Sequence, residues 1–266
     1  MLDLNRFVLN TFVEAAATPG TGTVGQRRRD AKAAGDARDA FARGMSLQAQ
    51  HEYAAAASCF RQALRGRADL LPCAHYQLGR LLEQGRGMRR DTVGAMQHFV
   101  RAARRGHARA MYRLGLAHAT GRGACRDDIM AMNWLRLAAA HGLSGAQYQL
   151  GMLYQAGGQI ARAPAAAMHW LRAAADGGAA AAQYELGRLH ELGDGCRRDP
   201  EQAVDWFRQA AEQGWWPAQF ALARLHEQAL RQWPEGRAAL QSWRRKALDY
   251  GEARTPLAWP AALARS

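Results

Sequence analysis

Two histidine–glutamate pairs come closest to a catalytic motif in this chain. His190-Glu191 and His226-Glu227 begin like the helical zinc-protease motif H-E-x-x-H, in which two histidines bind the metal and the glutamate acts as the general base. The second histidine of that motif is missing from both pairs. The sequence therefore does not predict a metalloprotease.

Two pairs of one histidine and one cysteine could also ligate a metal ion. His118 with Cys125, and His190 with Cys196, would each supply two ligands, whereas a structural zinc site uses four. The two pairs are far apart along the chain, so neither completes the other. We therefore expect no metal site and no cofactor.

Glycine pairs and serines give no better support for an enzyme. The pairs of the form Gly-x-Gly follow expected helices rather than strands, and none continues into a P-loop or a dinucleotide fingerprint, so we interpret them as turns. The five serines have no nucleophile-elbow context, and no clustered carboxylate pair stands out. We expect a protein without enzymatic activity. The glycine pairs are Gly85/Gly87, Gly121/Gly123 and Gly193/Gly195.

The elements that position these residues repeat every 36 residues, and the period repeats four times between Ala74 and Pro217. One tyrosine, one leucine and one glycine recur in each copy. A period in this range is typical of solenoids built from helical hairpins. The columns are Tyr76, Tyr112, Tyr148 and Tyr184; Leu78, Leu114, Leu150 and Leu186; and Gly79, Gly115, Gly151 and Gly187.

The copy that starts at Ala182 shows how one unit should fold. Its first helix is expected over residues 182–192, ended by Gly193, because glycine adopts the left-handed conformation easily. Asp199-Pro200-Glu201 should begin the second helix, since Asp caps free N–H groups and Pro suits the first helical position. Gly187 in mid-helix predicts that the partner helix comes too close for a Cβ.

A tryptophan column and paired alanines complete the pattern of the second helix. Trp134, Trp170 and Trp206 share one column, and each second helix ends in an alanine pair such as Ala210-Ala211. The whole pattern resembles the Sel1-like repeat, a subclass of the tetratricopeptide superfamily. The resemblance implies an all-α, right-handed α-solenoid of antiparallel helical hairpins. It covers four units, residues 74–109, 110–145, 146–181 and 182–217.

The third unit departs from this pattern in its loop. Gly157-Gly158-Gln159 replaces the usual residues, and Ala163-Pro164 stands where the other units have Asp91, Asp127 and Asp199. We therefore expect a looser turn in the third unit.

The ends of the chain should differ from the repeats, because a solenoid needs atypical end units to cover its core. Residues 30–73 resemble a divergent hairpin, with Tyr53 and Phe60 on its second helix, and residues 218–253 a degenerate fifth unit. Residues 1–29 are expected to form an amphipathic segment, which folds back or docks a partner, and a flexible linker over 18–29. Residues 254–266 should form a loose tail.

Charge and cysteine content limit where such a protein works. No apolar run approaches the roughly 18 residues of a membrane span, and the first ten residues lack the basic start of a secretory signal. The expected location is the cytoplasm, where free thiols are the usual state, although Cys59 and Cys73 are close enough in sequence to pair. Cys125 and Cys196 should lie too far apart to pair.

The chain carries a formal net charge of +13 that is unevenly distributed. Residues 74–109 hold eight Arg against Glu83 and Asp91, whereas residues 182–217 hold four Arg against seven acids. A basic end could attract nucleic acid, anionic lipid or an acidic protein, but it could equally be a solvated surface. The candidate basic patch consists of Arg80, Arg86, Arg89, Arg90, Arg101, Arg104, Arg105 and Arg109.

The resemblance places ligands in the concave groove formed by the first helices. Two columns should line it, namely the position directly after the repeated glycine and the position three residues later. They suggest a groove that is basic at both ends and apolar in its centre, around Leu116 and Met152. A partner helix or extended peptide with an apolar centre and acidic ends would suit such a groove. The alternative is that the tyrosines are core and the arginines pair with neighbouring acids. The candidate residues are Arg80, Glu83, Leu116, Met152, Arg188, Glu191 and Arg224.

Two functions follow from these observations. The first is a non-catalytic adaptor that binds another protein, in a bacterial signalling or envelope-assembly system, as the resemblance implies. The second is a binder of nucleic acid or another polyanion through the basic N-terminal half. That segment has no interleaved aromatic side chains for base stacking, which weakens the second function.

Overall fold

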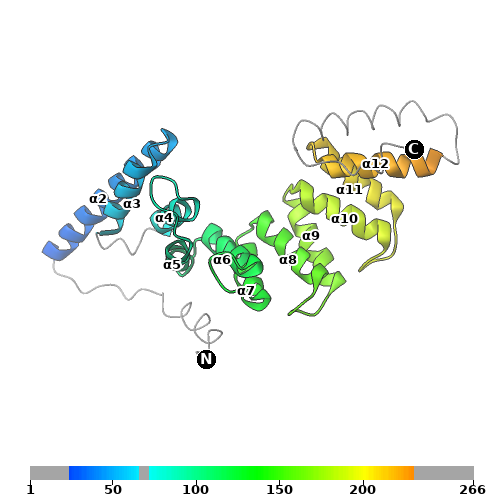
Figure 1. Ribbon diagram of the computed structural model, residues 1–266, viewed down its shortest axis with the longest axis horizontal. Helices are drawn as coiled ribbons and strands as arrows, with labels where there is room; N and C mark the ends of the chain where they lie inside the picture. Colours follow the sequence, from blue (N-terminus) through cyan, green and yellow to red (C-terminus); the bar gives the residue numbers. More distant parts are fainter. Residues whose placement is uncertain (1–23, 66–71, 231–266) are drawn as a thin grey trace. The chain divides into compact units, whose positions relative to one another are not determined.

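The computed structural model describes residues 24–65 and 72–230, and every regular element in these ranges is an α-helix. The chain forms two compact units, Met1–Leu143 and Ser144–Ser266. Within each unit, consecutive helices pack as antiparallel hairpins (Figure 1). The predicted all-α architecture of stacked hairpins is confirmed.

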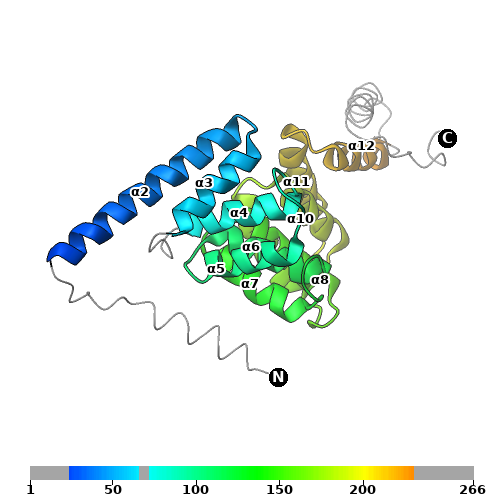
Figure 2. The same cartoon turned by 60° about the vertical axis from the view of Figure 1, so that its left-hand side comes forward.

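The first unit contains three hairpins. Each helix packs against the next along the chain, from α2 through to α7, and Figure 2 shows α2 and α3 side by side. The helices are α2 (Val24–Ala49), α3 (Tyr53–Arg65), α4 (Pro72–Gln84), α5 (Thr92–Ala103), α6 (Ala108–Thr120) and α7 (Asp128–Ala140).

The second unit contains two hairpins and one further helix. The same sequential packing joins α8 to α9, α9 to α10, α10 to α11 and α11 to α12. The second helix expected for the degenerate fifth unit lies outside the described residues. The helices are α8 (Ser144–Ala156), α9 (Pro164–Asp176), α10 (Ala180–Leu192), α11 (Pro200–Glu212) and α12 (Trp216–Leu230).

The repeated mid-helix glycine marks the tightest contact inside each hairpin. A Cβ on Gly187 would lie 2.6 Å from two ring carbons of Phe207, and a Cβ on Gly79 would lie 2.6 Å from Phe99. Real Cβ contacts are not this short, so the prediction that the partner helix leaves no room for a Cβ is confirmed. Gly44 of α2 has the same relation to Phe60 of α3, so the first hairpin shares this packing feature with the repeats.

The core column of the second helices is the one that follows the tryptophans. Phe99, Leu135, Leu171 and Phe207 are fully buried, whereas Trp170 and Trp206 are only half-buried. The paired alanines are buried beside this column, and their small size lets the helices approach closely. The repeated glycine therefore faces the residue after the tryptophan position.

Each hairpin loop is closed by one backbone hydrogen bond, and the third loop is no exception. Asp199 N–H donates to the His190 carbonyl at 2.9 Å, and Ala163 N–H donates to the Tyr154 carbonyl at 2.9 Å. The third loop nevertheless has fewer hydrogen bonds than the others, as the looser turn expected from the sequence requires. The bonds from Arg86, Arg122 and Asp194 N–H to the carbonyls of Leu81, Ala117 and Leu189 have no counterpart at Gly158, and Ala163 makes no cap hydrogen bond.

The aspartates of the other three units cap their second helices as predicted. The carboxylate of Asp199 accepts a hydrogen bond from Gln202 N–H at 3.0 Å, and those of Asp91 and Asp127 accept from Gly94 and Met130. Ala163 has φ −137° and ψ 83°, close to φ −143° and ψ 92° at Asp199. The backbone therefore keeps the shape of the cap where its side chain is missing.

The N-terminal linker predicted over residues 18–29 is wrong for its second half, because α2 already begins at Val24. From Gln26 to Ala34 the chain has neither glycine nor proline and is rich in arginine and alanine, which are good helix formers. The amphipathic segment before it and the tail at 254–266 lie outside the described residues. All four cysteines are free thiols.

Candidate partner-binding site

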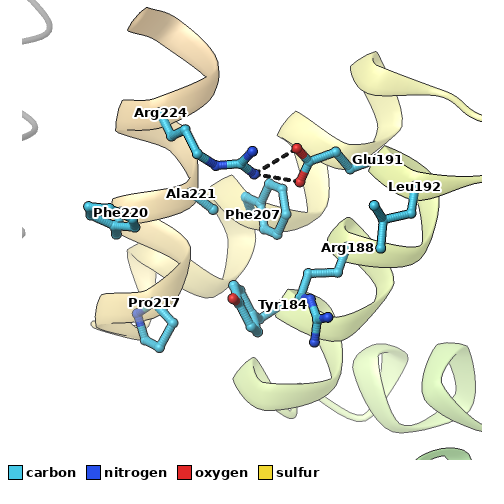
Figure 3. A pocket seen from close by; sticks show the side chains of 9 residues that line it. All are labelled: Tyr184, Arg188, Glu191, Leu192, Phe207, Pro217, Phe220, Ala221 and Arg224. Atoms are coloured by element: carbon cyan, nitrogen blue, oxygen red, sulfur yellow. Dashed lines mark hydrogen bonds and ion pairs between the residues drawn. The ribbon is translucent and has the colours of Figure 1, made fainter. Parts of the chain in front are cut away.

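A pocket of about 280 Å³ lies between α10 and α12 in the second unit (Figure 3). It brings together three of the candidate groove residues, Arg188, Glu191 and Arg224. Both helices contribute a single stripe of helically spaced residues, which is how two adjacent first helices can share one site. The lining residues are Tyr184, Arg188, Glu191, Leu192, Phe207, Pro217, Phe220, Ala221 and Arg224.

The floor and walls of this pocket are apolar. The buried Phe207 ring forms the floor, and the Tyr184 ring packs against it with centroids 5.6 Å apart. Phe220 on α12 is 37% exposed and Leu192 at the end of α10 is 64% exposed. Large apolar side chains that stay accessible beside a hollow are typical of binding surfaces.

The charged residues that line the pocket are Arg188, Glu191 and Arg224, and each belongs to an ion pair. Arg224 Nη2 donates to both carboxylate oxygens of Glu191 at 2.6 Å, which links α12 to α10 (Figure 3). Arg188 Nη1 donates to Glu185 at 2.9 Å, one turn earlier on the same helix. The alternative interpretation, that these arginines pair with neighbouring acids, is therefore confirmed for both.

In both ion pairs the arginine side chain is more exposed to solvent than the glutamate side chain. The side chains of Arg188 and Arg224 are each 42% exposed, whereas those of Glu191 and Glu185 are only 15% and 10% exposed. Burial raises the pKa of Glu185 despite the nearby Arg188 charge, and burial also raises the pKa of Tyr184. The surface at the pocket mouth is therefore cationic, although the pairs are formally balanced.

The remaining groove candidates are distributed over three other first helices. In the first unit, Glu83 of α4 pairs with Arg113 of α6 at 3.4 Å, and Leu116 is half-buried on α6. The Arg80 guanidinium lies over the Tyr76 ring, 5.9 Å from its centroid. In the second unit, Met152 is half-buried on α8. None of these four residues lines the pocket between α10 and α12.

The tyrosine column has different roles in different copies. Tyr76 is buried and stacks on His107 at 4.4 Å between centroids, so it belongs to the core. Tyr184 is half-buried and lines the pocket. Phe220 occupies the same column one period later, and sequence analysis missed it as a site residue. The feature that could have identified Phe220 is a large apolar residue in the tyrosine column of the degenerate fifth unit.

The arginines of the basic patch do not form one surface. Arg86, Arg89 and Arg90 lie in the loop between α4 and α5, whereas Arg101, Arg104 and Arg105 lie at or just after the far end of α5. That helix has 12 residues, which separates the two groups by about 18 Å at 1.5 Å per residue. Six of the eight arginines considered from the sequence thus form two clusters at opposite ends of α5, while Arg80 lies on α4 and Arg109 on α6.

The described residues give no support to metal or thiol chemistry. Within 24–65 and 72–230, no three His, Cys, Asp or Glu side chains are placed to hold a metal ion. Cys196 Sγ lies 3.7 Å from His190 Nδ1, but burial raises the pKa of the Cys196 thiol and lowers the pKa of His190. Both effects oppose the thiolate–imidazolium pair that an activated cysteine needs.

The described helices also include none that is both long enough and apolar enough to span a bilayer.

The fold and the site together define a repeat protein of stacked helical hairpins. The Sel1 repeat family matches residues 74–107, 108–143, 144–178 and 180–215, which is more than half of the chain. The chain therefore belongs to the Sel1 repeat family. The family boundaries fall close to the four units predicted from the sequence, and no curated protein matches the chain.

Solved structures similar to this chain include two bacterial proteins. A Sel1 repeat protein from Oxalobacter formigenes shares 26% identity with a TM-score of 0.72, over 79% of this chain and 85% of that one. A protective antigen present in uropathogenic Escherichia coli strains, which has the same repeat fold, shares 28% identity with a TM-score of 0.75. That match covers 92% of this chain but 53% of the antigen, so this chain spans about half of its length.

Proposed function

We propose that this protein is a non-catalytic adaptor that binds a partner protein on the exposed face of its first helices, in a bacterial signalling or envelope-assembly complex. Sel1 repeat proteins are generally protein–protein interaction scaffolds, and this chain has four such repeats. The observation that carries the proposal is the pocket between α10 and α12, with its apolar floor and exposed arginines.

The distribution of constant and variable residues supports this proposal. The repeated glycines and alanines are buried where one helix packs against the next. They are therefore not available to contact a partner protein. The position after the repeated glycine instead varies as Arg80, Leu116, Met152, Arg188 and Arg224. Partner choice by a repeat scaffold depends on such variable exposed positions, because every repeat supplies the same framework.

Affinity capture from the native cells tests the adaptor function. The wild-type chain should retain a protein in stoichiometric amount at moderate salt, and Arg188→Glu should release it because the charge at the pocket mouth is reversed. Arg208→Glu is the matched control, since Arg208 is also exposed and paired with an acid, but lies on the second helix α11. Equal capture by all three proteins would refute binding on the first-helix face.

A second candidate function is binding of nucleic acid or another polyanion. It is favoured by the exposed Arg89, Arg90 and Arg101 within a segment that carries eight arginines and two acids. Such binding should weaken by orders of magnitude between about 50 and 200 mM salt if several phosphates are contacted. Titration of labelled single-stranded RNA and DNA over that range tests it. A complex with protein that persists at the higher salt favours the adaptor instead.

A further inference from the structure

We infer that the pocket between α10 and α12 receives one large apolar side chain of the partner, and that Arg188 and Arg224 pair with acidic residues beside it. The inference rests on the proposed function and specifies the partner chemistry of that site. The partner segment is therefore an acidic peptide with an aromatic or large aliphatic anchor.

The pocket has room for one large side chain. Sites for small molecules and cofactors usually measure about 300–1,000 Å³, so this pocket, at about 280 Å³, lies at the lower end of that range. Its floor is the Phe207 ring, and Pro217, Phe220 and Ala221 of α12 form one wall. An anchor that enters such a hollow is desolvated on several sides, which is how one aromatic residue can dominate a binding energy.

The charges at the pocket mouth indicate acidic neighbours for that anchor. The side chains of Arg188 and Arg224 are each 42% exposed, while those of their partners Glu185 and Glu191 are 10% and 15% exposed. Each guanidinium has five N–H donors, and the recorded carboxylate contacts use Nη2 of Arg224 and Nη1 of Arg188. Carboxylates of a partner would meet accessible donors, whereas a basic partner would meet like charge.

The chain's own C-terminal sequence fits this site poorly. Residues 231–266 contain seven basic and three acidic residues, so their charge has the same sign as the pocket mouth. Residues 1–23 contain apolar residues with Asp3 and Glu14, and they are tested below as a competing occupant.

A random-peptide display selection against the full-length chain tests the inference. The selected peptides should share one Phe, Trp, Tyr, Leu or Met with Asp or Glu within a few positions. Fluorescence anisotropy should then show binding of a labelled peptide that weakens about tenfold when its acids become Asn or Gln, since a hydrogen bond to a charged group contributes about that factor. Replacement of its anchor by Ala should weaken binding at least as much.

Variants of the protein locate the binding. Phe220→Asp should abolish peptide binding because it places a carboxylate in the apolar wall. Val93→Asp is the matched control, since Val93 is an exposed apolar residue on the second helix α5. A circular dichroism melt of both variants shows that they remain folded, and Arg188→Lys should retain partial binding.

Each other outcome is decisive. Selected peptides that lack acids, or that bind Phe220→Asp as well as wild type, overturn the pocket inference and leave an adaptor that binds elsewhere. Failure to select any peptide also overturns it, and capture of a protein partner sensitive to Arg188→Glu would still support the adaptor function. A peptide of residues 1–23 that binds wild type but not Phe220→Asp, or self-association lost in Phe220→Asp, assigns the pocket to this chain itself and overturns an external partner.

Discussion

Gly151 of α8 faces Leu171 of α9 so closely that a Cβ on the glycine would lie 2.5 Å from Leu171 Cγ. The same Cβ would lie 3.2 Å from the Ala167 carbonyl oxygen, so both a side chain and the backbone of α9 oppose it. The glycine therefore sets the distance between the two helices of this hairpin. In each of the other three repeats the glycine likewise faces a side chain of the second helix at 2.6 Å, and Gly79 and Gly115 also face a backbone carbonyl.

Gly151→Ala should destabilise the protein by about 1–3 kcal/mol, as overpacking of a tight core does. Gly151→Leu should destabilise the protein more than Gly151→Ala does, because its side chain is larger. Gly35→Ala is the matched control, because Gly35 is also inside a helix but has no heavy atom within 4 Å of its would-be Cβ. It should stabilise by up to about 1 kcal/mol through helix propensity alone. Urea denaturation compares them, and equal midpoints would refute the packing role of Gly151.

Ala163→Asp should raise stability by about 0.5–1 kcal/mol, the usual contribution of a helix N-cap. The backbone at Ala163 already has the cap geometry and only the side-chain acceptor is missing. Asp199→Ala removes the same interaction from α11 and should lower stability by a similar amount. Thermal melts should therefore shift in opposite directions. A destabilising Ala163→Asp would contradict the inference that the backbone at Ala163 is already shaped for a cap.

Gly87→Ala should destabilise more than Gly106→Ala. Both glycines have positive φ, 70° and 80°, so both substitutions lose about 1–2 kcal/mol to left-handed strain. Only at Gly87 would the new Cβ collide with the backbone of Tyr53 and Ala54 in α3, whereas Gly106 has nothing within 4 Å. The difference in urea midpoint between the variants measures the contact of this loop with α3. A larger loss of stability in Gly106→Ala than in Gly87→Ala would contradict the close contact between the Gly87 loop and α3.

Stability should fall as the pH drops below about 6.5, in part because of His98. Burial, followed by the charges of Arg101 and Arg61, lowers the pKa of His98 below 6.5, and its Nδ1 lies 3.0 Å from His75 Nδ1. The unfolded chain therefore binds the proton first, so the stability present above pH 6.5 is lost below it. His98→Gln should flatten the pH dependence of the urea midpoint, without abolishing it, because burial also lowers the pKa of His107 and His190.

The hairpin framework could be predicted from sequence because every copy repeats the same packing problem. Tyr184, Gly187 and Asp199 recur at fixed spacing with a local structural role, and each was found where the pattern placed it. The third loop was predicted to be looser from Gly157-Gly158-Gln159 and from Ala163-Pro164, and it does lack one backbone bond and the side-chain cap. The backbone hydrogen bond from Ala163 to Tyr154 does not depend on the side chain, so its persistence could not be predicted from the sequence.

The pocket was only partly predictable. Arg188, Glu191 and Arg224 line one pocket, as their columns suggested, because neighbouring first helices repeat at the same spacing; that a partner binds there stays a prediction. The contribution of Phe220 and Leu192, and the burial of Glu185 beneath Arg188, depend on how deeply each side chain sits between helices. A period in sequence fixes which residues are neighbours in space, but it does not fix their relative exposure.

Site-specific photo-crosslinking tests the central claim of partner binding at this pocket most directly. Benzoylphenylalanine placed at Phe220 in the native cells should form a covalent adduct with one protein on irradiation. The same probe at Ile129, an exposed apolar residue on the second helix α7, should form none. Adducts at Ile129 but not at Phe220, or no protein adduct at either position, would contradict an adaptor that binds its partner between α10 and α12.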